Sequence, residues 1–495
     1  MVLMKTVIRN RLNRAKAIGI IIILTAYAPG VFKESFWSDD YPALMDTPGL
    51  VDHLLGDARP TAAALLSTSF SLINDPASAW TLRCLALVSL LLIFLFITNL
   101  INFSKYREFG TLSIAVASCL PSIQMYIHWS TTWFYLLAAL AGLYAFHFWS
   151  SKLTSQKIFA VFLLVLALTT YPPAALFFFA VIAVTNIIND SKNYKLFAEA
   201  LQGVILLLIS GLMSILVIII TMQMANISPN RRVKLVTLSE IPEKISWLAT
   251  RPIVIGLRPF VIDSPSVKVA LLTSIPVLLI ILFGIRRQSY HLGESIIYRG
   301  LGVALLFLLS LAPIVITSDN QIEFRILPGY SWGTAAITTY FLFTMITSWI
   351  ISLKINTRLE VASMLVVPTI LSVVAIATVN SHYTDFFGNP YQKKNAFLNT
   401  KISSCFGSAS IKKVVIIPPK IPFPVLPRLG VFSMSTDLAS GWVPKPNVEL
   451  LLRQANIKVP VIYVETRPLN INVTVTDCAI DLEEFRKSLT QASSK

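Results

Sequence analysis

Charged side chains are scarce in this chain. Asp, Glu, Lys and Arg make up 13% of its 495 residues, whereas hydrophobic residues make up 55%. Soluble globular proteins carry about 25% charged residues, so this composition excludes an ordinary soluble enzyme. The mean hydropathy of +0.69 agrees with this exclusion. We therefore predict an integral membrane protein whose first partner is the lipid bilayer.

Several motifs of soluble enzymes are also absent. The sequence has no G-x-G-x-x-G dinucleotide loop, no Walker phosphate loop and no H-E-x-x-H motif. Its five histidines are scattered without ligand spacing, which argues against a histidine-rich metal site. The net charge is +16, but no basic groove interleaved with aromatic residues is present. We therefore expect no nucleic-acid partner.

Apolar runs long enough to cross a bilayer recur along the chain. A helix needs roughly 20 apolar residues to span the hydrocarbon, and lipid offers the backbone no other hydrogen-bonding partner. The sequence thus predicts an all-α membrane domain, residues 1–382, of about eleven spans. The spans are expected near residues 17–32, 81–103, 111–128, 131–149, 158–171, 173–189, 198–222, 267–285, 299–317, 331–352 and 359–380. The runs 158–171 and 173–189 also leave open a single re-entrant hairpin.

The distribution of basic residues predicts the orientation of these spans. Five basic residues precede the first span, and further ones fall in alternate short loops. Because positively charged loops stay inside, the N-terminus is predicted inside and residues 33–80, 223–266, 318–330 and 382–495 outside. The basic segment 223–266 departs from this rule, as longer outside loops are allowed to do. A signal-peptide-like run ends at Ala28, but Pro29 argues against cleavage.

The last part of the chain, residues 383–495, differs in composition from the rest. Short β-branched runs at 414–417, 459–465 and 472–476 predict strands, and 449–454 and 481–489 predict helices. We expect a small α/β domain outside the membrane. Cys405 and Cys478 are its only cysteines, and an oxidising compartment would favour a disulfide between them. Cys84 and Cys119 fall in predicted spans and are expected to be buried apolar residues.

Two adjacent carboxylates follow the first apolar run directly, in the stretch SFWSDDYPALMD from Ser35 to Asp46. They lie in the acid-rich loop 33–80, whose residues 42–56 are apolar enough to form a helix in the membrane interface. In the ordinary interpretation, Asp39 and Asp40 form a solvated loop or a helix cap. In the functional interpretation, two like charges beside aromatic residues favour a perturbed pKa, which a general base needs.

Two motifs of this loop resemble a known family. Trp37-Ser38-Asp39-Asp40-Tyr41 after the first span, followed by Gly56-Asp57-Ala58-Arg59-Pro60, resembles the serotype-converting bacterial O-antigen glucosyltransferases, the glucosyltransferase II family. Thr170-Tyr171-Pro172-Pro173 is similar to a tyrosine-containing break in that family, with Pro172 in place of an expected Gln. The resemblance implies a GT-C-like inner-membrane enzyme. Such an enzyme moves glucose from undecaprenyl phosphate to a hydroxyl of O-antigen or another surface polysaccharide on the periplasmic side.

The resemblance also implies roles for single residues. Asp39, the first acid of the pair, is expected to be the general base, and Asp40 to orient the acceptor or a metal. The departing lipid phosphate needs cations, and Arg59 and Arg325 are the candidates because a guanidinium matches phosphate oxygens. For Arg325, an ion pair with Glu323 or Asp319 is the alternative. The further substrate-binding candidates are Trp37, Tyr41, Tyr171 and Glu323. No cofactor is required, and a divalent metal is left open.

Two other classes of protein fit the sequence less well. A transporter or a flippase of lipid-linked sugars would place ionisable residues inside its spans, near the midplane of the bilayer. Here the predicted spans are nearly free of Asp and Glu. A scaffold that presents the outside domain for binding would leave the acidic loop without a role. The acids gather at one outside surface, which favours surface chemistry on a lipid-linked substrate.

Overall fold

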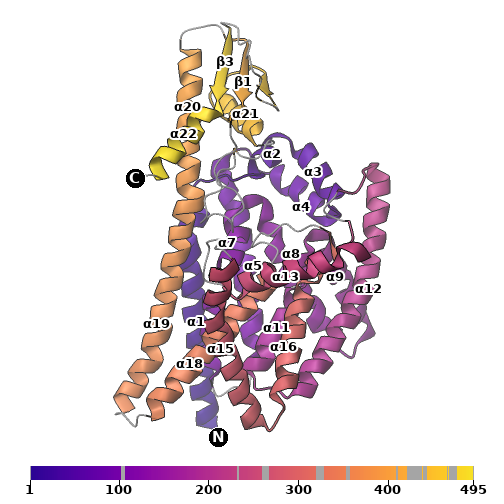
Figure 1. Cartoon of the computed structure of the whole chain (residues 1–495), viewed down its shortest axis with the longest axis vertical. Helices are drawn as coiled ribbons and strands as arrows, with labels where there is room; N and C mark the ends of the chain where they lie inside the picture. The colour runs from indigo at the N-terminus through magenta and orange to yellow at the C-terminus, as the bar shows by residue number, and fades with distance from the viewer. Residues whose placement is uncertain are drawn as a thin grey trace.

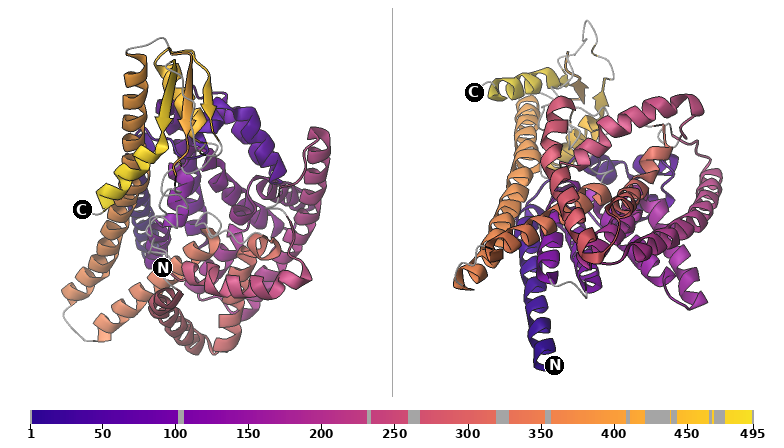
Figure 2. Two further views of the ribbon diagram at one scale, coloured as in Figure 1. Left: turned by 45° about the horizontal axis from the view of Figure 1, so that its top comes forward. Right: turned by 60° about the horizontal axis from the view of Figure 1, so that its bottom comes forward.

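The computed structural model describes residues 2–101, 106–230, 234–258, 267–318, 328–352, 357–407, 411–420, 438, 443–464, 467 and 476–493. A bundle of helices forms most of the molecule, and a small sheet lies at one end of it (Figure 1). We call the end that carries α2, α3 and the sheet the upper end. The N-terminus lies at the opposite, lower end (Figures 1 and 2).

The bundle is built from helices of very different lengths. In chain order they are α1 (Val2–Phe32), α5 (Trp80–Leu100), α6 (Arg107–Ala117), α7 (Pro121–His128), α8 (Trp133–Trp149), α9 (Thr154–Thr170), α10 (Pro172–Ala175), α11 (Phe177–Ile188), α12 (Asn193–Ala225), α15 (Val267–Leu292), α16 (Ile296–Ser310), α17 (Ala312–Ile316), α18 (Pro328–Ser352) and α19 (Thr357–His382).

The lengths of these helices indicate a multi-pass membrane protein. Within the described residues, seven helices are long and apolar enough to cross a membrane, or up to eight if α6 and α7, bent by 56°, form one span. Shorter apolar helices occupy 154–170, 172–188 and 296–310. The membrane class is therefore supported, but the predicted count of about eleven spans is not reached, because three predicted runs form helices shorter than a bilayer needs.

The helices α11 and α12 differ in how much of their surface is buried. Every residue of α11 is buried, whereas α12 exposes large apolar side chains such as Leu201, Leu208 and Leu212 along its length. An exposed surface of this kind suits hydrocarbon rather than water. Gly142 lets α8 approach its neighbour closely, because a Cβ there would lie 2.2 Å from the carbonyl oxygen of Ala175.

Short helices at the upper end fill the predicted loop 33–80. They are α2 (Asp40–Met45), α3 (Thr47–Gly56), α4 (Pro60–Phe70) and the 3₁₀ turn η1 (Pro76–Ala79). The helix expected at 42–56 is thus present as α2 and α3. Asp46 separates the two and caps α3, since its carboxylate accepts a hydrogen bond from the N–H of Gly49. After α12, the chain forms η4 (Leu238–Glu240), α13 (Ile241–Thr250) and α14 (Pro252–Gly256).

Residues from 389 onward form the C-terminal unit. α19 continues through a π-helical segment, η6 (Tyr383–Gly388), into α20 (Asn389–Phe406). Then come β1 (Lys413–Ile417), α21 (Pro444–Gln454), β2 (Val461–Tyr463), β3 (Asp477–Asp481) and α22 (Leu482–Ser493). The strands are parallel in the order β2-β1-β3, with Val414 opposite both Val461 and Cys478. The strands predicted at 414–417 and 459–465 and both helices are present. Of the third predicted strand, 472–476, residues 472–475 lie outside the described residues.

The C-terminal unit has its own hydrophobic core and a covalent tie. Leu398 and Ile402 of α20 pack with Val414, Leu451 and Phe485 from the other elements. Cys405 and Cys478 form a disulfide that joins α20 to β3, with 5.5 Å between their Cα atoms. The predicted disulfide is therefore confirmed. Within the described residues, Cys84 and Cys119 are free, and only Cys119 is fully buried.

Candidate functional site

The Asp40 carboxylate links two distant segments at the upper end. It is fully buried. Its Oδ2 accepts hydrogen bonds from the main-chain N–H groups of Trp37 at 3.0 Å and Ser130 at 3.4 Å, and its Oδ1 accepts one from Thr131 at 2.8 Å. The N–H of Asp40 in turn donates to the carbonyl of Trp37. The 3₁₀ turn η2 (Ser130–Thr132) leads straight into α8. Asp40 therefore ties the first loop to the start of α8.

The electrostatic environment of Asp40 is unusual for a carboxylic acid. Burial raises the pKa of the Asp40 carboxyl from 3.8 to about 7. Two opposing influences, the main-chain donors and the positive charge of Arg83, lower this pKa, while the charge of Asp39 raises it. The sequence predicted a perturbed pKa for the acidic pair, and the structure assigns it to Asp40 through burial.

Asp39 is the more accessible acid of the pair. Its side chain is half-buried. Asp39 occupies the N-cap position of α2 (Asp40–Met45), all of which is described, and its side chain makes no capping hydrogen bond to that helix. Its Oδ1 accepts a hydrogen bond from the hydroxyl of Ser38 at 3.3 Å. Ser38 itself has φ of +46°, a left-handed conformation that costs a non-glycine residue roughly 1–2 kcal/mol. A strained turn thus presents Asp39.

Two of the three predicted aromatic binding residues, Trp37 and Tyr41, are buried beside the acidic turn. Trp37 packs edge-on against Trp129, with 4.8 Å between ring centroids, and also against Phe387. Tyr41 is fully buried. Its hydroxyl accepts a hydrogen bond of 2.5 Å from the ammonium of Lys394. Both rings therefore shape the acidic turn from within.

The second motif of the loop has a close-packed backbone. A Cβ on Gly56 would lie 2.8 Å from the side chain of Asn230, whose N–H donates to the Gly56 carbonyl. The buried carboxylate of Asp57 accepts a hydrogen bond of 2.9 Å from the same asparagine. Ala58 is left-handed, with φ of +60°. Since Pro60 then begins α4, this tight turn fixes the position of Arg59.

Arg59 and Tyr171, predicted from two separate motifs, are in contact. The guanidinium of Arg59 lies 5.1 Å from the centroid of the Tyr171 ring. Tyr135 of α8 stacks on Tyr171 with 3.7 Å between centroids, and its hydroxyl accepts a hydrogen bond of 3.4 Å from Arg59. Tyr171 has an extended backbone between α9 and α10, because a residue before proline disfavours the helical conformation. The side chain of Arg59 remains 19% exposed.

Arg83 is a member of this site that the sequence analysis missed. It is fully buried near the start of α5. Its guanidinium donates to the carbonyl of Lys33 at 2.8 Å and to the carbonyl and hydroxyl of Ser35 at 2.9 and 2.5 Å. These bonds hold the chain between α1 and the acidic pair. The available signal was a lone arginine within an otherwise apolar run.

The segment from His128 to Thr131, whose main chain binds Asp40, carries several buried polar atoms without hydrogen-bond partners in the described part of the chain. Among the described residues, both ring nitrogens of His128 and the hydroxyls of Ser130 and Thr131 make no hydrogen bond. The His128 ring packs against the rings of Tyr27 and Tyr383. Buried polar groups are nearly always satisfied in proteins, by protein atoms or by bound water. These buried groups therefore have hydrogen-bonding capacity for bound water.

Two predicted site residues lie outside the described residues. Glu323 and Arg325, together with Asp319, fall in residues 319–327. Within the described residues, no group of three or more His, Cys, Asp or Glu side chains is arranged to hold a metal ion. The role of a divalent metal therefore stays an open prediction.

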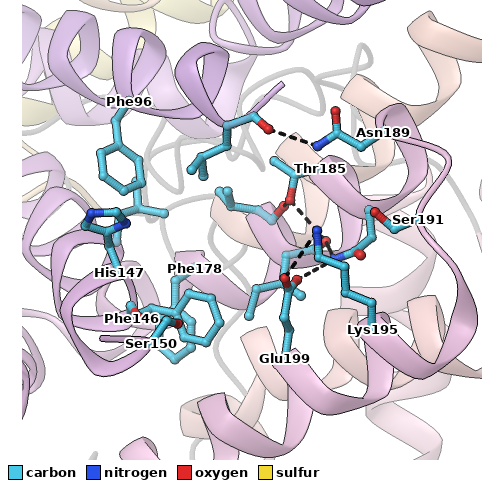
Figure 3. Close-up of a pocket in the computed structure, with 15 residues that line it drawn as sticks. Phe96, Phe146, His147, Ser150, Phe178, Thr185, Asn189, Ser191, Lys195 and Glu199 are labelled. Carbon is cyan, nitrogen blue, oxygen red and sulfur yellow. Dashed lines mark hydrogen bonds and ion pairs between the residues drawn. The ribbon is translucent and has the colours of Figure 1, made fainter. Parts of the chain in front are cut away.

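A cavity elsewhere in the bundle contains none of the motif residues. It has a volume of about 180 Å³ and lies among α5, α8, α11 and α12. Figure 3 shows Phe96 and His147 on one side of it and Lys195 and Glu199 on another. Lys195 and Glu199 form an ion pair of 3.7 Å. The amide of Asn186 donates to Glu199 at 2.6 Å. Lys195, Glu199 and Asn186 are thus engaged with one another, whereas the side-chain oxygens of Asn186 and Asn189 make no hydrogen bond to any described residue.

Comparison with known proteins does not identify a family for this chain. No model of a known protein family matches the chain, and no curated protein sequence matches it. The functional inference therefore depends on the residues of the upper end and on the motif resemblance.

Proposed function

We propose that this protein is an inverting glycosyltransferase that moves glucose from undecaprenyl phosphate to a hydroxyl of O-antigen or a related surface polysaccharide. The observation that carries the proposal is the contact between Arg59 and Tyr171. The two residues come from separate motifs of the resemblance, and they meet beside α8, whose preceding turn also binds Asp40.

The proposed reaction assigns each group a task. The lipid tail of the donor lies in the bilayer while its sugar reaches the upper end. The acceptor oxygen attacks C1 of the sugar, and the bond between C1 and the phosphate oxygen breaks. The phosphate leaves with the electron pair, and Asp39 takes the proton of the acceptor hydroxyl. Arg59 stabilises the developing phosphate charge, and Arg325 is the proposed second cation.

The environment of Asp40 favours a positioning role over contact with the acceptor. Three main-chain N–H groups already occupy its carboxylate oxygens. In the proposed enzyme, Asp40 therefore keeps the acidic turn against α8, and Asp39 is the acid that meets substrate. Trp37 and Tyr41 support this turn, and Glu323 stays a proposed partner of Arg325.

We further propose that the upper end faces the periplasm and that the chain lies in the bacterial inner membrane. The ends of α5 and α11 meet at the lower end, where the amide of Asn189 donates to the carbonyl of Leu100. Basic residues flank this end, including Lys152, Lys192 and Arg286, which supports an inside location. Single cysteines placed at exposed positions within residues 39–57, such as Asp52 and His53, should react with an impermeant reagent from outside. Reaction only at residues 286–295 would reverse the orientation.

A transfer assay tests the proposed function. Membranes that contain the protein receive polyprenyl phosphate carrying labelled glucose, and label in polysaccharide is measured. We expect transfer by the wild type and by Asp52→Asn, a control that alters an exposed acid of the same loop. Asp39→Asn should lose transfer. Movement of the labelled donor across the membrane without transfer would instead support a flippase.

A further inference from the structure

One continuous helix connects the bundle to the C-terminal unit. The helix from Val366 to Phe406 is 41 residues long and contains an apolar segment that could cross a membrane. At 1.5 Å per residue this helix is about 60 Å long, roughly twice the hydrocarbon thickness of a bilayer. Figure 1 shows α19 and α20 following one side of the molecule up to the sheet. The upper half of this helix therefore stands beside the acidic loop.

Lys394, on α20, makes an unusual contact with that loop. Its side chain is 1% exposed. Its ammonium lies 4.0 Å from the centroid of the Tyr41 ring and donates to the Tyr41 hydroxyl. Burying an ammonium is costly unless nearby groups compensate, and here an aromatic face and a hydroxyl do so. Lys393, the preceding residue, is exposed. The burial of Lys394 is thus specific to its position.

Two further contacts join the C-terminal unit to the same loop. The hydroxyl of Tyr391, one turn before Lys394, donates to Glu34 at 2.5 Å. On the other side, α21 packs against α2, and Val443 and Leu450 belong to the hydrophobic core of the bundle. The acidic turn is therefore held from α5 and α8 on the bundle side and from α20 and α21 on the C-terminal side.

We infer that Lys394 is a positioning residue for the acidic turn, with Tyr391 assisting it. Lys394 holds Tyr41, which directly follows Asp39 and Asp40 in the chain, and Tyr391 holds Glu34 at the other end of the segment. The C-terminal unit then contributes to the site by positioning the acidic turn. This inference rests on the proposed function only where it concerns transfer, since the hold on the turn is a property of the fold.

The test uses the full-length protein and two measurements. Lys394→Met removes the ammonium while keeping an apolar chain of similar length, Lys394→Arg keeps a cation, and Lys393→Met is the matched control. Hydrogen exchange of the amides in residues 34–45 should become at least about tenfold faster in Lys394→Met. The kcat of transfer should fall at least about tenfold, with a smaller change in KM. Lys394→Arg should restore part of both, and Lys393→Met should match the wild type.

The two measurements separate this inference from the proposed function. If Lys394→Met exchanges and transfers like Lys393→Met, Lys394 does not position the turn, and the transferase proposal is unaffected. If the wild type transfers no sugar, the proposed function is wrong, and the exchange rates still decide whether Lys394 holds the turn. If Lys394→Met does not fold, Tyr391→Phe replaces it. That variant removes the hydroxyl that donates to Glu34 and that also bonds Asn395 within α20, and unchanged exchange at residues 34–37 would overturn the inference.

Discussion

The Oδ1 atom of Asp40 accepts a hydrogen bond of 2.8 Å from the main-chain N–H of Thr131. Thr131 lies one helical turn before Tyr135, whose hydroxyl accepts a hydrogen bond from Arg59. The start of α8 therefore connects the acidic motif to the arginine motif. Any movement of this turn would change the distance between the proposed base and the proposed phosphate ligand.

Replacing each acid by asparagine should affect stability and transfer differently at Asp39 and at Asp40. Asp40→Asn places an NH₂ group against N–H donors, so it should lower the free energy of unfolding by about 1–3 kcal/mol. Asp39→Asn should change stability by less than about 0.5 kcal/mol while transfer falls by roughly 10²–10⁴-fold. Thermal unfolding and the transfer assay measure both effects. A stable Asp40→Asn without transfer, beside an active Asp39→Asn, would swap the roles.

The raised pKa of Asp40 predicts a pH dependence of stability. Its ordinary pKa is 3.8, and its pKa in the folded protein is about 7. Between these values the folded state keeps a proton that the unfolded state releases, so the free energy of unfolding should fall as pH rises. Melting temperatures from pH 5 to 8 should decline more steeply for the wild type than for Asp40→Asn. Parallel curves would show that Asp40 has an ordinary pKa.

Replacing Arg59 should distinguish the contribution of its positive charge to transfer from the contribution of its planar guanidinium. Arg59→Ala should reduce kcat/KM by roughly 10²–10³-fold if the guanidinium stabilises the departing phosphate. Arg59→Lys should lie between this variant and the wild type, because lysine keeps the charge and loses the fork. Tyr171→Phe should stay active, since the ring under the guanidinium is retained. Arg251→Ala, at an exposed arginine, is the control. Full activity of Arg59→Ala would remove Arg59 from the site.

Arg83 should matter for stability. Arg83→Met loses hydrogen bonds to Lys33 and Ser35 and should lower the unfolding free energy by about 1–3 kcal/mol for each buried acceptor left unpaired. Arg286→Met, at an exposed position of α15, should be nearly neutral. Thermal unfolding in detergent compares the two variants. Equal melting temperatures would show that the Lys33–Ser35 segment does not need Arg83.

The disulfide should stabilise the C-terminal unit. Cys405→Ser should cost about 2–4 kcal/mol, since the bond closes a long loop. Faster hydrogen exchange of β3 and α22 is the expected signature, with Cys84→Ser as the control because Cys84 is free. Unchanged exchange in Cys405→Ser would show that core packing alone holds β3 against α20.

The sequence predicted features that depend on local patterns. The run Val414–Ile417 predicted β1, and the cysteine count led to the disulfide that joins α20 to β3. The Gly56–Pro60 motif pointed to Arg59 and the mid-chain break to Tyr171, and their proposed roles stay predictions although the two side chains are in contact. The predictions of β1 and of the disulfide succeeded for a common reason, because each signal lies within a few neighbouring residues or in a small number of possible pairs.

Features that depend on distant partners were not predicted. Nothing near Lys394 in the sequence indicates that its ammonium contacts Tyr41 across the fold. In the sequence, Arg83 is a single arginine within an apolar run. In the structure, its guanidinium binds the segment that precedes the acidic pair. The burial of Asp40 depends on the turn before α8, a segment far along the chain. Burial and pairing of single polar residues are properties of the assembled fold.

The π-helical segment at Tyr383–Gly388 affects which side chains of α20 face the acidic turn, because it precedes α20 in the same continuous helix. A π-helical turn accommodates one more residue than an α-helical turn. Deleting one residue there would restore an ordinary α-helical turn and leave the phase of α20 nearly unchanged. Deleting one residue from the first turn of α20 would instead rotate the rest of that helix by about 100° around its axis and lower it by about 1.5 Å. The ammonium of Lys394 would then face away from Tyr41, although α19 would keep its place in the bundle. A change in helical phase alone would therefore uncouple the C-terminal unit from the acidic turn.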